Sequence, residues 1–206
     1  MVHELRTITE SQILRSWALA ETNSIAFREF FRGGVPQPLW DKIESGPHNF
    51  SEDEWQILEE AIRAIRSPLL KDLLPLGLEW YTGTLPEQEL QDLELMNWDG
   101  FSGIRGSRKL IDLVRAYQEG GLNTGLREFI ENLDRMWRGF RLANMKGMPI
   151  IVGRNKRHPY ILVEGYKRSA SLLLNMLEGI SFGGSIPVIL GTSNRLEEWI
   201  FYRDIT

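Results

Sequence analysis

The first third of the chain has apolar residues at helical spacing. Runs with this period cover residues 9–32, 39–45 and 51–65, and the first and third open with a hydroxyl residue three positions before Gln or Glu, the spacing of a capping box. A proline near the start of 67–74 favours the first turn of another short helix. Glycine and proline pairs interrupt the runs. Residues 1–77 are therefore expected to form a helical layer, with these tryptophans in its core: Trp17, Trp40 and Trp55.

The pattern changes at about residue 78, where short apolar runs begin to alternate with helical periods. The expected strands cover 78–85, 149–153, 160–164 and 186–190, and the expected helices cover 86–95, 110–118, 126–140, 166–177 and 195–202. Pro187 makes an interior, fully paired position for that residue less favourable, because proline has no amide hydrogen to donate. The fold class expected is α+β, a helical N-terminal layer followed by a mixed α/β domain at 78–206. The stretch 122–147 has the character of a helical insertion.

The composition limits the kinds of functional site that the protein can contain. The 206 residues contain no cysteine and three well-separated histidines, which argues against disulfides, thiol nucleophiles, iron–sulfur clusters and zinc sites. No apolar stretch reaches the length of a membrane span, and the first residues lack the features of a secretory signal. We expect a cytoplasmic protein with no membrane partner.

The charge is unevenly distributed along the chain. The formal net charge is −4, but residues 1–137 carry −9 and residues 138–206 carry +5. Within 138–168, eight basic residues are opposed only by Glu164. A segment this basic in an acidic protein indicates a local anion site, although a solvated basic face docked on the acidic half would give the same pattern.

The most specific local pattern is the run YILVEGYKRSASLL, in which a buried strand passes through one glycine into a helix. Gly165 permits a tight turn and close approach to a ligand, and the first amides of the helix with its dipole favour an anion there. Lys167 and Arg168 add positive charge, and Ser169 adds a hydroxyl. Glu164 could act as a general base, orient a metal or balance the basic pair.

The order of elements from about residue 78 to 191 resembles the ParB/sulfiredoxin-like superfamily over about 115 residues. The segments that carry the resemblance are WYTGTL, GIRGSRKLIDLVRAYQEGG, PIIVG, YILVEGYKRSASLL and IPVIL. The glycine and arginine of the family's phosphate-binding box fall on Gly165 and Arg168. The resemblance implies that this box holds the triphosphate of ATP or CTP, usually with Mg²⁺. It also implies a second phosphate contact from the preceding loop, and the residues there are Ser102, Arg105, Ser107 and Arg108.

Departures from the family limit what can be carried over. Sulfiredoxins need a cysteine inside the box, so the reduction of sulfinic acids is not expected here. Chromosome-partitioning ParB proteins add a helix-turn-helix domain after the box, whereas only about 15 residues follow IPVIL. The family's free-serine kinases share the acid that Glu164 provides, but they use histidines where this chain has Tyr166 and Lys167.

These patterns favour a ParB-like protein that binds a nucleotide through its phosphates and hydrolyses it or transfers a phosphoryl group. In this hypothesis Glu164 is the catalytic acid–base group, and the phosphate-binding residues are Gly165, Lys167, Arg168, Ser169, Arg105, Ser107 and Arg108. Two alternatives stay open. One is a non-enzymatic binder of DNA or RNA, in which 138–168 tracks a phosphate backbone with Trp137, Phe140 and Tyr166. The other is an interaction protein, such as a toxin–antitoxin or phage-defence component, with exposed tryptophans at Trp80, Trp98 and Trp199.

Overall fold

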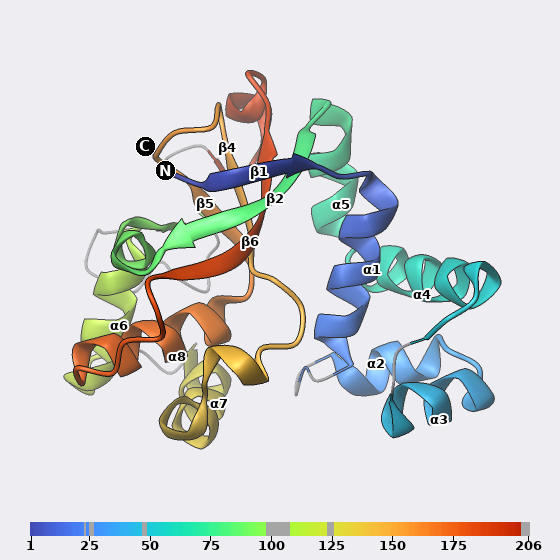
Figure 1. The fold of residues 1–206 in the computed structure, drawn as a ribbon, viewed down its shortest axis with the longest axis horizontal. Coiled ribbons are helices and arrows are strands. Elements are labelled where there is room, and N and C mark those ends of the chain that lie inside the picture. The colour runs from blue at the N-terminus through green and yellow to red at the C-terminus, as the bar shows by residue number, and fades with distance from the viewer. Residues whose placement is uncertain (23, 25–26, 47–48, 98–107, 123–125, 203–206) are drawn as a thin grey trace. The chain divides into compact units, whose positions relative to one another are not determined.

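The chain has an α+β fold, seen in a computed structural model (Figure 1). The structure describes all residues except 23, 25–26, 47–48, 98–107, 123–125 and 203–206. It divides into two compact units, which we take in turn: a helical unit of residues 8–74 with 146–148, and a sheet unit of residues 1–7, 75–145 and 149–206.

The helical unit contains α1 (Glu10–Glu21), α2 (Arg28–Gly33), α3 (Gln37–Ser45), α4 (Glu52–Ile65) and α5 (Ser67–Leu73). Thr9 and Ser51 close the predicted capping boxes of α1 and α4. The single helix expected over 9–32 is instead two, because α1 ends at Glu21 and a new helix starts at Arg28.

The core of the helical unit is aromatic and includes one buried ion pair. Trp17 and Trp40 are fully buried, as predicted, whereas Trp55 is partly exposed. Glu21 is also buried, and it accepts hydrogen bonds from the Trp17 indole at 3.1 Å and from Nε of Arg66 at 2.8 Å. Each partner lowers the cost of burying this carboxylate.

A six-stranded mixed sheet forms the centre of the other unit, in the order β1-β2-β6-β4-β5-β3. The strands are β1 (His3–Thr7), β2 (Glu79–Pro86), β3 (Glu94–Leu95), β4 (Ile150–Gly153), β5 (Ile161–Glu164) and β6 (Ser185–Thr192). β4 runs parallel to β6 and β3 runs parallel to β5, while the other neighbours are antiparallel.

β4, β5 and β6 form the middle of the sheet, and most of their residues are buried and apolar. Pro187 lies on β6 opposite Thr84 of β2, and the ladder with β4 begins only at Ile189. This central strand therefore carries its proline where one side of the ladder is absent, which agrees with the sequence prediction for that residue.

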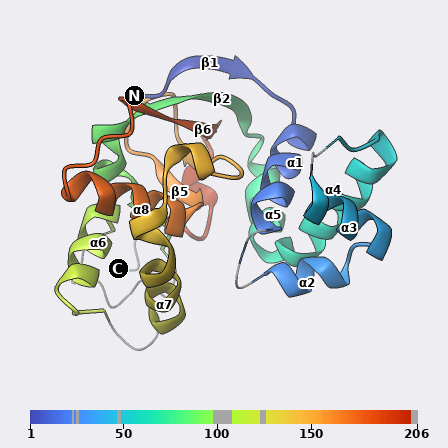
Figure 2. The same ribbon diagram turned by 60° about the horizontal axis from the view of Figure 1, so that its bottom comes forward.

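Helices α6 (Leu110–Gln118), α7 (Arg127–Met136) and α8 (Tyr166–Leu177) lie on one side of this sheet (Figure 2). Leu113 of α6 and Leu173 of α8 share one apolar cluster with Leu162 and Leu190 of the sheet. The 122–147 stretch contains α7 and the short 3₁₀ helices Trp137–Gly139 and Leu142–Asn144. It is fixed to α8 by Asn175, whose amide donates to the carbonyls of Trp137 at 3.1 Å and Phe140 at 3.0 Å.

Several elements differ from the sequence-based expectation. Residues 3–7 form β1 and not part of the helical layer; Glu87–Asp92 is a 3₁₀ helix; and the expected closing helix is only the short 3₁₀ turn Leu196–Glu198. The chain becomes extended at Trp199, whose side chain is fully buried.

Two of the three tryptophans expected to be exposed are buried. Trp80 packs its ring against the backbone of Gly191, where an added Cβ would lie 2.5 Å from the ring, and Trp199 is enclosed in the core. The prediction for these two residues was wrong, and Trp98 lies outside the described residues. Among the described residues, no helix is long and apolar enough to cross a membrane.

Candidate phosphate-binding site

The candidate site is the turn where β5 ends and α8 begins. Glu164 is the last residue of β5, Gly165 is the N-cap residue of α8, and the helix starts at Tyr166. Gly165 has a left-handed backbone with φ of 96° and ψ of 21°, a conformation that a residue with a side chain adopts only at a cost. The tight turn predicted from the sequence is present.

Gly165 is also required by the space around it. A Cβ at this position would lie 3.1 Å from Cα and 3.2 Å from Cβ of Pro149, the residue before β4. The same Cβ would lie 3.4 Å from a guanidinium nitrogen of Arg168. The turn is thus packed against its neighbours with its backbone close to the Arg168 head group.

The start of α8 suits an anion. Its N-cap residue, Gly165, has no side chain to cap the helix, its first turn contains no acidic residue, and Lys167 and Arg168 lie in that turn. The amide of Ser169 closes the first helical bond to the carbonyl of Gly165 at 2.8 Å. The amides before it belong to the part of a helix that its own ladder does not satisfy, where the positive end of the dipole lies.

Glu164 and Arg168 form an ion pair across the turn. A guanidinium nitrogen of Arg168 lies 3.1 Å from Oε1 of Glu164, and the side chains are 12% and 19% exposed. Because both groups are largely shielded from water, their attraction is stronger than that of a surface pair. The carboxylate and the strongest candidate phosphate ligand are therefore adjacent, as the sequence suggested.

The remaining residues of the box are placed less favourably for a ligand. Ser169 is fully buried, and its hydroxyl has no hydrogen-bond partner among the described residues. Tyr166 is partly buried and donates its hydroxyl hydrogen to the carbonyl of Leu162. Lys167 is partly exposed.

The second loop that the resemblance implicates is described only in part. Ser102, Arg105 and Ser107 lie outside the described residues. Arg108 is described, and its guanidinium donates to the carbonyl of Leu95 from Nε at 3.2 Å and to the carbonyl of Tyr202 at 3.1 Å. These bonds tie the start of the α6 segment to β3 and to the last described residues.

The basic segment 138–168 is not gathered at one place. Arg154, Lys156 and Arg157 lie on the turn between β4 and β5, whereas Lys167 and Arg168 follow the other end of β5. The net charge of +7 that the sequence gives for this segment is therefore spread over at least two surfaces.

One ionisable pair was not found from the sequence. His158 on the β4–β5 turn lies 2.5 Å from Oε2 of Glu89, which also pairs with the amino group of Met1. Burial alone would raise the pKa of Glu89, but the bonds from Met1 and His158 lower it below its usual range. Glu89 and His158 are 69 positions apart, so no local pattern could have linked them.

The described residues contain no group of three or more side chains suited to hold a metal ion. Glu164 could supply one carboxylate to Mg²⁺, an ion that proteins commonly hold through one or two carboxylates together with substrate phosphates. Comparisons with protein-family models, curated proteins and solved structures gave no match.

Proposed function

We propose that this protein binds a nucleotide through its phosphate groups at the start of α8. The observation that supports this most directly is Gly165, a left-handed N-cap residue with no room for a side chain beside Arg168. A glycine turn that leads a strand into a helix brings backbone amides, a helix dipole and cationic side chains to one point. The resemblance to ParB/sulfiredoxin-like proteins agrees with this use of the turn.

In this proposal the phosphates bind at the amides of the first turn of α8, and Arg168 and Lys167 neutralise their charge. Arg168 is suited to two parallel hydrogen bonds with a phosphate, because its planar guanidinium matches that geometry. A phosphate competes with Glu164 for this guanidinium, since the two now form an ion pair. Arg105, Ser107 and Arg108 would close the site from the preceding loop.

We extend the proposal to the chemistry that Glu164 can perform. A carboxylate beside a bound phosphate can accept the proton of an attacking water or hydroxyl as the new O–P bond forms and the bond to the leaving oxygen breaks. Mg²⁺ that accompanies ATP or CTP would neutralise phosphate charge, with Glu164 as its protein contact. Hydrolysis and phosphoryl transfer differ only in the acceptor.

The direct test is thermal unfolding of the wild type with ATP, CTP or GTP, each with and without Mg²⁺. A ligand at about 100 times its Kd should stabilise the protein by about 2.7 kcal/mol. Arg168→Ala should remove this stabilisation. Arg115→Ala on α6 is the matched control, because Arg115 has a 62% exposed side chain and only a 4.0 Å contact with Asp112.

If no nucleotide stabilises the wild type, or if Arg115→Ala removes the shift as fully as Arg168→Ala, the proposal is wrong. Short DNA and RNA form the comparison arm, because a nucleic-acid binder was the main alternative. Trp137, Phe140 and Tyr166 were the rings expected to stack on bases in that alternative, and all three are partly buried against the core of the sheet unit. This packing supports the proposal of a nucleotide ligand over that of a DNA or RNA strand.

A further inference from the structure

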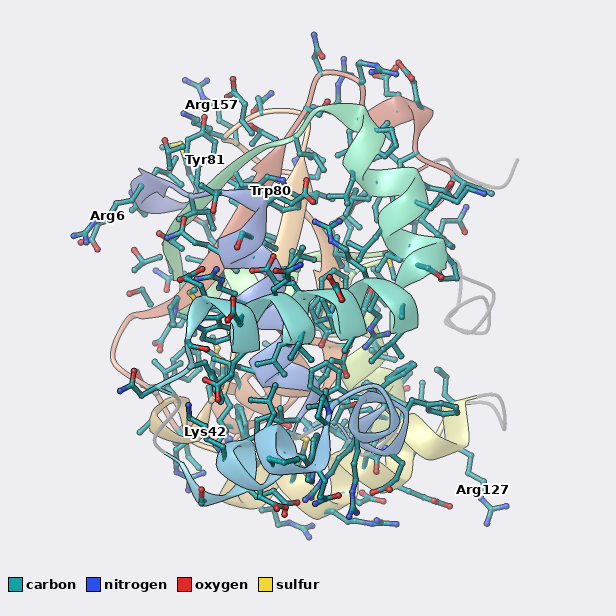
Figure 3. All side chains as sticks on the ribbon, turned by 90° about the vertical axis from the view of Figure 1, so that its right-hand side faces the viewer. Arg6, Lys42, Trp80, Tyr81, Arg127 and Arg157 are labelled. Carbon is teal, nitrogen blue, oxygen red and sulfur yellow. The ribbon has the colours of Figure 1, made fainter. Side chains whose placement is uncertain are left out.

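A polar pocket lies at the other end of the sheet from Gly165. It has a volume of about 720 Å³ and is formed where β4 and β6 end and β2 begins. Its walls include Arg154, Lys156, Arg157, Thr192, Asn194 and Glu79. Figure 3 shows Arg157 and Tyr81 at the same margin of the sheet unit, with the Arg157 side chain directed outward.

The turn that supplies the cations is joined to the core by hydrogen bonds and close packing. Tyr160, which is fully buried, donates its hydroxyl hydrogen to the carbonyl of Lys156 at 2.6 Å. The amide of Arg157 donates to Oδ1 of Asn155 at 2.8 Å. Gly153 starts the turn where a Cβ would lie 2.9 Å from the Tyr160 ring. A turn fixed to the core in this way presents its side chains with little further ordering, which lowers the cost of binding.

The three cations on the turn have different partners. Arg154 pairs with Glu197 at 2.5 Å, and the ammonium of Lys156 lies 4.0 Å from the centre of the Tyr81 ring. The Arg157 guanidinium makes no hydrogen bond or ion pair with any residue that the structure describes. The Asn194 side chain, which also lines the pocket, is likewise without a hydrogen bond in the described part of the chain. Arg157 and Asn194 are thus available to a ligand.

The surroundings favour a small ligand over a polymer. Glu79 lines the pocket and Glu197 holds Arg154 at its edge, so cations and carboxylates are interleaved here. A nucleic-acid backbone is usually met by a continuous basic stripe, which this surface does not provide. A single phosphate group needs only the local charge of Arg157 and Lys156.

The polarity of the walls limits the rest of the ligand. Apart from Met1 and Gly77, every residue that lines the pocket has a polar or charged side chain, so the lining contains no aromatic ring on which a nucleobase could stack. Hydroxyl groups, in contrast, could bond to the Asn194 and Asn155 amides. An adjoining pocket of about 460 Å³ shares both asparagines and extends to His158 and Tyr202.

We propose that this pocket binds a small hydrophilic phosphate ester of the sugar phosphate type. The phosphate lies at Arg157 and Lys156, and the hydroxyl groups lie against Asn155 and Asn194. The site does not depend on the nucleotide site at α8, because the two lie at opposite ends of β5 and share no residue.

The test is a calorimetric titration of the full chain with ribose 5-phosphate, ribose, inorganic phosphate and a short oligonucleotide. We expect saturable binding of ribose 5-phosphate, weaker binding of inorganic phosphate and none of ribose. Arg157→Gln should weaken the binding of ribose 5-phosphate at least about tenfold, since it removes a charged hydrogen bond to the phosphate. Asn194→Ala should weaken it by a smaller factor.

Two variants serve as controls. Arg115→Gln makes the same change of charge at an exposed position of α6 and should bind ribose 5-phosphate like the wild type. Arg168→Ala should also bind ribose 5-phosphate like the wild type, although it loses nucleotide binding. The inference is overturned if ribose 5-phosphate shows no saturable binding or if Arg115→Gln weakens it equally. It is also overturned if only Arg168→Ala weakens it, or if the oligonucleotide alone binds through Arg157. The variants at Arg157, Asn194 and Arg115 should melt within about 2 °C of the wild type, since these three side chains are exposed.

Discussion

The guanidinium of Arg168 donates a hydrogen bond to Oε1 of Glu164 at 3.1 Å and thereby joins the end of β5 to the first turn of α8. This ion pair shields the cation that the proposed function assigns to phosphate. Besides its proposed contact with Mg²⁺, Glu164 therefore has two effects on the phosphate. It competes with the ligand for Arg168, and it places a base beside the reacting phosphate.

The two effects of Glu164 can be separated with Glu164→Gln. This variant keeps the shape of the side chain and removes its negative charge, so nucleotide without Mg²⁺ should bind at least as tightly as to the wild type, while any hydrolysis or transfer in the presence of Mg²⁺ falls by about 100-fold or more. Titration calorimetry measures the first effect and phosphate release the second. A large loss of affinity in Glu164→Gln would show that the carboxylate helps to hold the ligand.

Gly165→Ala tests whether the turn is as constrained as its geometry indicates. The variant combines a left-handed alanine with contacts of 3.1 and 3.2 Å to Pro149, and we expect it to lose about 2–3 kcal/mol of unfolding free energy. Gly179→Ala is the control, because Gly179 at the other end of α8 also has a positive φ of 80° but nothing within 4 Å. That variant should lose only about 1 kcal/mol. Urea unfolding compares the two, and equal losses would contradict the role of the Pro149 contact.

Ser169→Ala should not reduce stability. The Ser169 hydroxyl is buried without a partner in the described residues, so the folded state bears the cost of its desolvation. Because the variant removes this cost, we expect the free energy of unfolding to rise by between about 0 and 1 kcal/mol. Nucleotide affinity should stay within about twofold, because the proposal places the phosphate at Lys167 and Arg168. A strong loss of affinity in Ser169→Ala with unchanged stability would instead place this hydroxyl among the phosphate contacts.

The elements that the sequence predicted well are those with strong local signals. Residues next to each other in the sequence determine three such features: the capping box at Ser51, the proline-led start of α5 and the strand–glycine–helix run at Gly165. β1 contains none, since its five residues HELRT do not alternate, and it is a strand only because β2 pairs with it. The long helix expected over 9–32 failed for the opposite reason, because an apolar period continued past the end of α1.

The same distinction applies to the candidate site, where local sequence predicts some features and not others. The left-handed backbone of Gly165 follows from the strand–glycine–helix run. The Glu164–Arg168 pair follows from a spacing of four residues across the turn. The burial of Ser169 depends on which face of α8 packs on the sheet, and the pocket at Arg157 needs the ends of β2, β4 and β6 together. Neither is visible in a local pattern. Summed charge indicated an anion site in 138–168, but it could not show that the segment turns back on itself.

Arg66→Met should destabilise the helical unit. Glu21 is 1% exposed and Arg66 is its partner, so the variant leaves a buried carboxylate with one charged partner removed, while the methionine keeps the packing against Phe27. We expect a loss of about 3 kcal/mol. Arg63→Met is the control, since the pair of Arg63 with Glu10 is about half exposed on both sides and contributes less than about 1 kcal/mol. Adding Glu21→Gln to Arg66→Met should recover part of the loss in urea unfolding, and no recovery would contradict the electrostatic cause.

Tyr117 should make stability fall at alkaline pH. Burial and the hydrogen bond that its hydroxyl donates to Asp134 raise the pKa of Tyr117 to about 12. A folded-state pKa above the ordinary value of about 10 contributes stability that is complete below about pH 10 and is lost as the pH rises towards 12. The wild type should therefore exceed Tyr117→Phe in unfolding free energy at about pH 8 by more than it does at about pH 11.5.

In a titration of tyrosinate absorbance, Asp134→Asn should shift the last ionisation to lower pH and Tyr117→Phe should remove it. An unchanged titration in both variants would contradict the assignment.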